Sequence, residues 1–329
     1  MKIRKPGVVL IVFSSAAIIL APGVASGTFP GDNGLVVVIG EEIKTEDEEG
    51  NRTCEFSSPT DIYTMQPDGS EVDVFHDAQG YAQSAKWASD GESLAVSIVD
   101  DDAQGAGVFT IAADGSDLRT VIDEEADEAN PAWSPDGRRI AYERGWRRRG
   151  GTNVWTIKPD GTDRKQLTSH RAEDGMPAWA PDGKRIAFAS SRRGGGYDIY
   201  TMNRRGADTD RVTKNATLQR RPNGKKRWGG LTTLSWSPDG RWILFEANKG
   251  DGAANVYKVR PDGSNKKRLH EGRYPTWSPD GSKILFLGDV TPSGRCTPEL
   301  YEMDPNGAGV KKLTTRNDVG MYHLDWQPR

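Results

Sequence analysis

Cysteine and histidine are scarce in this sequence, which has two Cys and four His among 329 residues. It contains no Gly-x-Ser-x-Gly or His-Glu-x-x-His segment, and its Cys and His residues lack the spacing of metal ligands. These absences exclude the commonest signatures of serine hydrolases and zinc peptidases. No residue is therefore assigned as catalytic, and no metal site is predicted. Beyond the N-terminus, no apolar run approaches the roughly 20 residues of a membrane-spanning helix.

The N-terminus has the pattern of a secretory signal peptide. Lys2, Arg4 and Lys5 precede an apolar run from Val8 to Leu20, and Pro22 follows. We predict a signal peptide over residues 1–26 and one mature domain over 27–329, exported to the periplasm, the cell envelope or the outside; an uncleaved anchor is the alternative. Loss of three cations changes the formal charge of −3 to about −6. We therefore expect no nucleic-acid partner, no membrane span after cleavage, and a monomer.

A repeat organises the rest of the chain. A Trp followed by Ser/Ala-Pro-Asp-Gly or a close variant recurs about every 41 to 57 residues, the period of one propeller blade. A second turn, Pro-Asp-Gly or a variant, recurs alongside it. The repeated tryptophans are Trp87, Trp133, Trp179, Trp236, Trp277 and, in a truncated copy, Trp326.

One repeat, residues 130–168, shows what each copy builds. Its two Pro-Asp-Gly turns separate short β-branched and aromatic runs, which is the pattern of a four-stranded antiparallel meander. Compared with the other copies, Trp133 is predicted to lie in the core. Asp136 and Asp160 are predicted to form turns rather than to carry chemistry.

The two chain ends complete one another. Residues 33–39, 61–65 and 72–75 resemble the second, third and fourth strands of a repeat, and the missing first strand is the one that carries Trp326. We predict an all-β fold: a six-bladed β-propeller of four-stranded antiparallel blades whose last blade is shared by both termini. Sharing a blade closes the ring and removes the exposed sheet edge of an open array.

The Trp-Ser-Pro-Asp-Gly and Ile-Tyr-Thr-Met-x-Pro-Asp-Gly segments resemble the PD40 repeats of TolB-like six-bladed β-propellers. Residues 29–39 also resemble the opening of exported TolB-like proteins, and the resemblance extends over about residues 29 to 329. It implies the propeller fold. TolB itself carries an α/β domain before its propeller, and this chain shows no segment for one, so the resemblance implies no role in the Tol-Pal system.

Blade topology predicts where a site lies. With strands A to D running outward from the axis, the short uniform hairpins share one face, and the variable D–A and B–C connections share the other. Residues of the D–A connections are expected to ring the channel mouth. There they form either a pocket for a polar ligand or an extended peptide, or a polar rim filled with water. The candidates are Glu128, Asn130, Arg171, Asp174, Arg273, Asp318 and His323.

The same face carries charged loops. Residues 41–49 and 100–102 are acidic, and oxygen-rich clusters suggest Ca²⁺, but they lack the alternate spacing of a calcium loop, so no cofactor is predicted. Residues 144–149 and 220–228 are basic and are either solvated loops or contacts for an acidic protein or an anionic cell-envelope polymer. The predicted contacts are Arg147, Arg148, Arg149, Lys225, Lys226, Arg227 and Trp228.

Two functions stay open. The favoured one is a non-catalytic scaffold that binds a protein or an envelope ligand through the D–A and B–C face. The alternative is a propeller hydrolase or lyase acting on a carbohydrate or a small ester, with His323, Asp174 and Arg273 as acid–base groups. All four His lie in or beside D–A connections, which places them near one mouth if those connections converge.

Cys54 and Cys296 fall in B–C connections of the shared blade and of the blade before it. Both connections lie on one face of an exported protein, so we predict a disulfide that ties the two blades at the closure. Folded, non-reduced protein is expected to react with no maleimide, and unfolded, reduced protein with two equivalents. Two reactive thiols in the folded protein would contradict the pairing.

Overall fold

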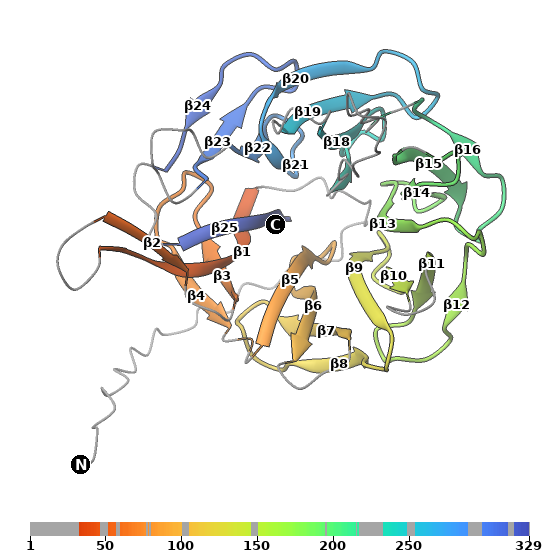
Figure 1. The fold of residues 1–329 in the computed structure, drawn as a ribbon, viewed down its shortest axis with the longest axis horizontal. Helices are drawn as coiled ribbons and strands as arrows, with labels where there is room; N and C mark the ends of the chain where they lie inside the picture. Colours follow the sequence, from red (N-terminus) through yellow and green to blue (C-terminus); the bar gives the residue numbers. More distant parts are fainter. Residues whose placement is uncertain are drawn as a thin grey trace, which may run out of the picture.

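The computed structural model describes residues 33–46, 52–56, 60–76, 78, 80–100, 105–145, 151–194, 196–214, 216, 233–248, 254–288, 298–314 and 319–328. These residues form strands and turns but no helix, and accordingly no helix in these ranges has the length and apolar character to cross a membrane. Six antiparallel sheets surround a common axis (Figure 1). The predicted all-β, six-bladed propeller is confirmed. The predicted signal peptide lies outside the described residues.

Five blades are complete along the chain, and in each the strands follow one another from the axis outward. We number these blades 1 to 5 in sequence order. Their strands are β5 (Gly80–Trp87), β6 (Ser93–Asp100), β7 (Ala106–Ala112) and β8 (Arg119–Ile122) in blade 1; β9 (Asp127–Trp133), β10 (Ile140–Gly145), β11 (Thr152–Ile157) and β12 (Lys165–Gln166) in blade 2; β13 (Asp174–Trp179), β14 (Arg185–Ser190), β15 (Asp198–Asn203) and β16 (Asp210–Arg211) in blade 3; β17 (Leu234–Trp236), β18 (Ile243–Asn248), β19 (Ala254–Val259) and β20 (Lys267–Glu271) in blade 4; and β21 (Arg273–Trp277), β22 (Ile284–Leu287), β23 (Leu300–Met303) and β24 (Lys311–Lys312) in blade 5.

The sixth, closing blade combines the two ends of the chain. Its inner strand is β25 (Val319–Pro328), followed outward by β1 (Asn33–Glu46), β3 (Asp61–Met65) and β4 (Asp73–His76). Val36 pairs with Trp326 on one side and with Met65 on the other. The predicted sharing of one blade by both termini is therefore confirmed.

The closing blade differs from expectation in its B–C connection. The acidic segment predicted as a loop continues β1 as far as Glu46, and β2 (Arg52–Phe56) pairs with it, Ile43 opposite Phe56. Cys54 therefore lies in a strand rather than in a loop. Figure 1 shows this two-stranded ribbon projecting from the ring. The cause is backbone pairing: once β1 and β3 separate, the extended chain pairs with the next extended segment instead.

The hydrophobic core is divided among the six interfaces between neighbouring blades. Each of six clusters of buried side chains joins residues from two adjacent blades. Successive residues of β10 point to opposite faces, so Ala141 packs in the cluster shared with blade 3 and Tyr142 in the cluster shared with blade 1. Trp133 is 9% exposed and belongs to the latter, which confirms its predicted place in the core.

The repeated aspartates act in their own turns. Asp136 accepts the Ser134 hydroxyl at 2.7 Å and the Arg138 N–H at 3.1 Å. Asp160 accepts the Thr162 hydroxyl at 2.6 Å and its N–H at 2.9 Å, and these hydrogen bonds lower the pKa of Asp160. Both carboxylates are satisfied within four residues, so the predicted turn-forming role is confirmed.

Polar contacts at the last strand fasten the ring. Asp325 of β25 accepts the Lys86 ammonium and the Trp87 N–H of blade 1, each at 2.9 Å. Gln327 accepts the Leu35 N–H at 3.0 Å and donates to the Gly91 carbonyl at 2.9 Å. The last strand therefore holds both β1, the second strand of its own blade, and the first complete blade.

Replacing Asp325 by Ala is expected to lower the free energy of unfolding by about 2 to 3 kcal/mol, because the partly buried Lys86 ammonium and Trp87 N–H lose their acceptor. Asp304→Ala is the matched control, since its 2.9 Å pair with Lys283 is more exposed. Loss of that pair should cost less than about 1 kcal/mol. Urea unfolding followed by tryptophan fluorescence measures both. Equal losses in the two variants would contradict a special role for Asp325 in closure.

Candidate functional site

The six inner strands surround an axial channel. The residue three positions before each repeated tryptophan lies in its inner strand or, in blade 4, directly before it, and we call these six the channel ring: Ser84, Asn130, Met176, Thr233, Tyr274 and His323. All but Tyr274 line a cavity of about 20 Å³, and the Tyr274 and His323 rings lie 6.3 Å apart. The six repeated tryptophans line a second cavity of about 80 Å³ nearer the hairpins. These two cavities together hold space for a few water molecules.

Three members of the channel ring have an unusual backbone. Asn130, Met176 and Tyr274 have φ values of 50°, 52° and 49°, each immediately before a proline, in the left-handed region that side chains larger than Asn seldom adopt. Each lies at a bulge where the pairing of its inner strand shifts. Such a conformation costs about 1 to 2 kcal/mol per residue and persists only when surrounding contacts enforce it.

Glutamates of neighbouring blades supply the enforcing contacts at two of these bulges. Glu143 of blade 2 accepts the Met176 N–H at 2.8 Å, and Glu246 of blade 4 accepts the Tyr274 N–H at 3.1 Å. Each carboxylate reaches across a blade interface from the same position of a second strand. A Cβ at Gly175 would lie 2.2 Å from the Glu143 carboxylate, so only glycine leaves room for this contact.

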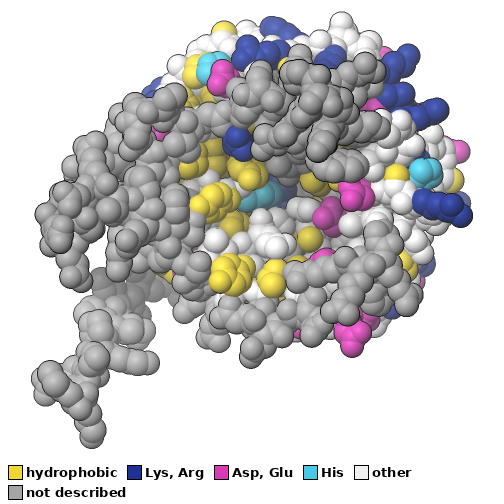
Figure 2. Space-filling view, viewed as in Figure 1, with side chains coloured by type: hydrophobic (Ala, Val, Ile, Leu, Met, Phe, Trp, Pro, Cys, Tyr) yellow, Lys and Arg dark blue, Asp and Glu magenta, His cyan; other side chains and the backbone are white. Residues whose placement is uncertain are grey.

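The Glu143 carboxylate belongs to an acidic group, the carboxylate cluster, made of Asp127, Glu143 and Glu173. Burial raises the pKa of Glu143, with smaller contributions from its two acidic neighbours, while hydrogen bonds from the Met176 N–H and the Asn130 side chain oppose the rise. Tyr197 donates its phenol to Glu173, and burial together with this contact raises the pKa of Tyr197. Figure 2 shows the face that bears the D–A connections, where hydrophobic side chains border a central hollow and acidic side chains lie on one side of it.

Glu128, predicted for the channel mouth, lies between blades 1 and 2 instead. Its side chain is fully buried, with a carboxylate oxygen 3.2 Å from Arg144 Nε, and Arg144 also pairs with Glu124 at 2.5 Å. Arg144 and Arg164 both lie over the Trp155 ring. Burial raises the pKa of Glu128 to about 7, against the opposing effect of Arg144. This carboxylate reaches a ligand only if the surrounding ion pairs open.

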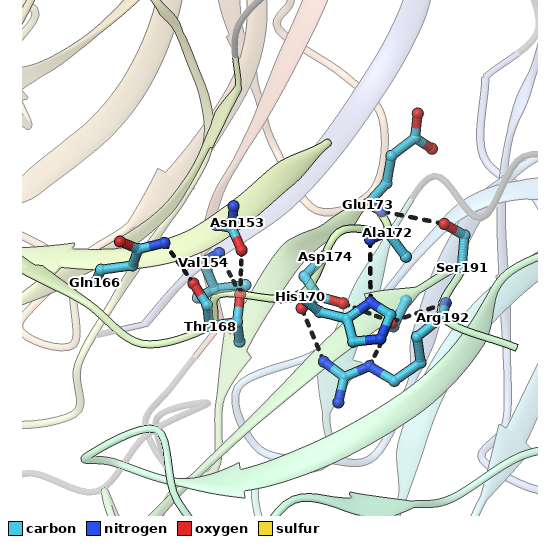
Figure 3. A network of polar contacts seen from close by, with 11 residues as sticks. Asn153, Val154, Gln166, Thr168, His170, Ala172, Glu173, Asp174, Ser191 and Arg192 are labelled. Atoms are coloured by element: carbon cyan, nitrogen blue, oxygen red, sulfur yellow. Dashed lines mark hydrogen bonds and ion pairs between the residues drawn. The ribbon is translucent and has the colours of Figure 1, made fainter. Parts of the chain in front are cut away.

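Asp174 occupies the equivalent place between blades 2 and 3. It is fully buried and accepts the Ser190 hydroxyl at 2.5 Å and the Arg192 guanidinium at 2.8 Å (Figure 3). Arg192 in turn lies over the Tyr200 ring. The carboxylate is therefore already paired with a cation at the blade interface.

The remaining predicted residues are dispersed. Asn130 and His323 belong to the channel ring, Arg171 is exposed in the connection before β13, and Arg273 begins β21 and is partly buried. The ligand-binding role of the seven channel-mouth candidates stays a prediction. The other predicted side chains lie outside the described residues, and these are Cys54, Arg147, Arg148, Arg149, Lys225, Lys226, Arg227, Trp228, Cys296 and Asp318.

Only one of the four histidines lines the channel. His323 is 6% exposed and its Nε2–H donates to the Ala85 carbonyl at 3.1 Å. Burial, with a smaller effect of Lys86, lowers the pKa of His323 to about 3, so the imidazole is neutral near pH 7. The other three do not line that cavity: two lie on outer strands and one in an exposed connection, and these are His76, His270 and His170.

Sequence reasoning missed the carboxylate cluster and Tyr197. A signal was present for Glu143: at its position the second strand of most other blades has a small or apolar residue, such as Ser97, Ala189 or Leu287. A charge at a buried position of this kind indicates a specific partner. In the part of the chain that the structure describes, no group of three or more His, Cys, Asp or Glu side chains has the geometry of a metal site. The acidic segments considered for Ca²⁺ have no described side chains.

Comparisons with known proteins identify relatives of this architecture. The PD40 family, described as the TolB beta propeller domain, matches residues 55–228. The uncharacterized protein Atu1656 of Agrobacterium fabrum is 31% identical over 125 residues, which span 36% of this chain and 38% of that relative.

Two solved structures show the same fold. TolB from Acinetobacter baumannii superposes with a TM-score of 0.68 at 15% identity, over 91% of this chain and 68% of that chain. An oligogalacturonate lyase in complex with manganese superposes with a TM-score of 0.52 at 15% identity, over 74% of this chain and 71% of that chain. At such identities the likeness concerns the fold alone.

The buried neutral state of His323 predicts a pH dependence. The folded pKa of about 3 lies below the unfolded value of 6.5, so this group's contribution to stability is present above pH 6.5 and decreases as the pH falls toward 3. Its loss by pH 4.5 should be about 2 to 3 kcal/mol. His323→Gln keeps a donor for the Ala85 carbonyl without titrating, which makes it the control.

Urea unfolding at pH 7.5, 6, 5 and 4.5 measures the difference in stability between wild type and His323→Gln. Groups that titrate alike in both proteins make equal contributions, and these cancel in the difference. We expect the free energy of unfolding of wild type to decrease relative to that of the variant as the pH falls. A difference independent of pH would show that His323 is not held neutral by the fold.

Proposed function

The chain belongs to the PD40 family of TolB β-propeller domains, and from that premise we propose that it is an exported, non-catalytic scaffold. It binds a protein or a cell-envelope polymer on the face that bears the D–A and B–C connections, and it works in the periplasm, the envelope or outside the cell. The proposed contacts for anionic groups of the partner are the basic residues that lie outside the described ranges: Arg147, Arg148, Arg149, Lys225, Lys226 and Arg227, with Trp228 beside them in the sequence.

The observation that supports this proposal most is the carboxylate cluster with Tyr197, called the rim below, on the face that bears the D–A connections. Met176 is held in its strained conformation by Glu143, and Glu173 is held by Tyr197. Side chains fixed by one another lose little freedom on binding, so they present a preorganised surface. The carboxylates of the rim favour basic or hydrogen-bond-donating groups on the partner segment that enters the mouth.

Acid–base catalysis receives less support. Of its three nominated groups, His323 lines the axial cavity, Asp174 is paired with Arg192 between blades, and Arg273 does not line that cavity. General acid–base chemistry needs groups within hydrogen-bond reach of one substrate atom. Two observations favour the enzyme alternative: a neutral imidazole that lines the same cavity as Asn130, and a fold like that of an oligogalacturonate lyase.

A binding experiment tests the scaffold proposal. Glu173→Gln removes one rim charge and keeps the side-chain size, whereas Glu92→Gln makes the same change at an exposed site on the hairpin face. Proteins and polymers retained from envelope extract by immobilised chain 27–329 are identified, and the affinity of each is then measured. A specific partner of the mouth should bind Glu173→Gln about tenfold more weakly and Glu92→Gln unchanged. Equal affinity for all three proteins would contradict binding at the mouth.

The enzyme alternative is decided by turnover. Wild type and His323→Gln are incubated with polygalacturonate and with p-nitrophenyl acetate, and unsaturated uronate and nitrophenolate are followed by absorbance. The scaffold proposal expects no turnover above buffer. Turnover that disappears in His323→Gln would establish the alternative.

A further inference from the structure

A basic groove lies on the hairpin face, opposite the proposed partner surface. It has a volume of about 780 Å³ and runs between blades 2 and 3. The first hairpins of both blades, β12 and the outer hairpin of blade 3 form its walls, and Pro135, Leu167 and Pro181 are among the apolar groups lining it. Its basic side chains are Arg138, Arg139, Lys165, Arg204 and Arg205.

The outer hairpin of blade 3 departs from the repeat at this groove. In the other blades an Asp or Asn of the hairpin accepts an N–H two residues later, as Asp114 does from Ser116 at 3.0 Å. The matching contacts are Asp68 with Ser70, Asp160 with Thr162, Asp262 with Ser264 and Asn306 with Ala308. Blade 3 has Arg204 and Arg205 where the other copies have Pro-Asp, Ala-Asp or Pro-Asn.

The turn itself does not need these arginines. Asn203 accepts the N–H of Arg205 at 2.9 Å and that of Ala207 at 3.1 Å, so it replaces the missing aspartate as the turn-forming side chain. Both arginine side chains are exposed. A hairpin that carries a negative charge in most blades therefore carries two positive charges here, with its turn preserved by another residue.

The charges of the groove are unevenly satisfied. Arg139 pairs with Asp163, and Lys165 lies 3.2 Å from the same carboxylate. Arg138, Arg204 and Arg205 form no ion pair with any described residue. The two aspartates that line the groove accept backbone N–H groups of their own turns. Asp136 accepts the Arg138 N–H, and Asp182 accepts the Lys184 N–H. The groove therefore presents a surplus of exposed guanidinium groups.

We propose that this groove binds an extended acidic segment of a partner polypeptide. Guanidinium groups pair with carboxylates through two parallel hydrogen bonds, and three unpaired ones on both walls suit a chain with repeated Asp or Glu. The apolar walls accommodate the aliphatic parts of amino-acid side chains. Stacking of sugar rings on exposed aromatic faces has no surface here, because the one aromatic lining residue, Trp179, is only 8% exposed, and this favours a polypeptide over an anionic polysaccharide.

A binding experiment with matched variants tests the proposal. The probe is a fluorescein-labelled peptide of about ten residues rich in Glu, with a Gln peptide of equal length as reference, followed by anisotropy. Arg204→Ala with Arg205→Asp recreates the Ala-Asp-Gly turn of blade 1, where Ala113 N–H bonds the Glu92 carbonyl as Arg204 N–H bonds that of Lys184. The fold thus already contains this hairpin. Arg241→Asp with Arg260→Ala changes the net charge equally at another exposed place.

Wild type should bind the Glu peptide at least tenfold more tightly than the Gln peptide, with weaker binding at high salt. The blade 3 variant should lose about tenfold in affinity, and the blade 4 variant should stay within about twofold. Equal losses in both variants, or no preference for Glu over Gln, would overturn the proposal. Tighter binding of an oligogalacturonate of equal charge than of the Glu peptide would also overturn the proposal. It would identify an anionic glycan as the ligand of the groove. Arg138→Ser repeats the test with one exposed substitution, should the double variant not fold.

Discussion

Each blade of this protein has two apolar faces, and neither is covered unless a neighbouring blade packs against it. Adjacent residues of one strand, such as Ala141 and Tyr142, contribute to two different clusters. Burial of apolar surface, worth about 25 cal/mol per Å², is therefore gained only in pairs of blades. A ring satisfies every face and an open array leaves two bare, so stability depends on the last interface. Asp325 and Gln327 fasten the blade at which that ring closes.

Packing of blade against blade also brings the polar groups of the mouth together. The carboxylates of Glu143 and Glu246 cross from one blade to the inner strand of the next, where they hold a backbone N–H in a bulge. Partial burial raises the pKa of Glu143, and these hydrogen bonds oppose the rise. The same bulges direct the channel ring toward the axis. The blade interfaces that stabilise the fold therefore also keep the strained residues of the channel ring in their left-handed conformation. Fold and candidate site depend on the same contacts.

The described residues of the two faces differ in the charged groups that stand out from the repeat. The D–A face has carboxylates at the channel mouth, held by Tyr197 and by backbone N–H groups. The hairpin face is built from a uniform turn, and its one conspicuous departure is the arginine pair of blade 3. A repeated scaffold makes such departures informative, since the other copies show what folding alone requires.

The sequence alone determined the number of blades, the shared blade and the roles of Trp133, Asp136 and Asp160, because these depend on periodicity and on local turn chemistry that every copy repeats. It did not determine which polar residues meet. Glu128 and Asp174 have the same position in neighbouring repeats and were expected at the mouth, yet an Arg from the adjacent strand or its end holds each one inside a blade interface. Conversely, Glu143 and Met176 are 33 residues apart and meet only because two blades pack face to face. Contacts between blades depend on the three-dimensional ring, so only the tertiary structure decided them.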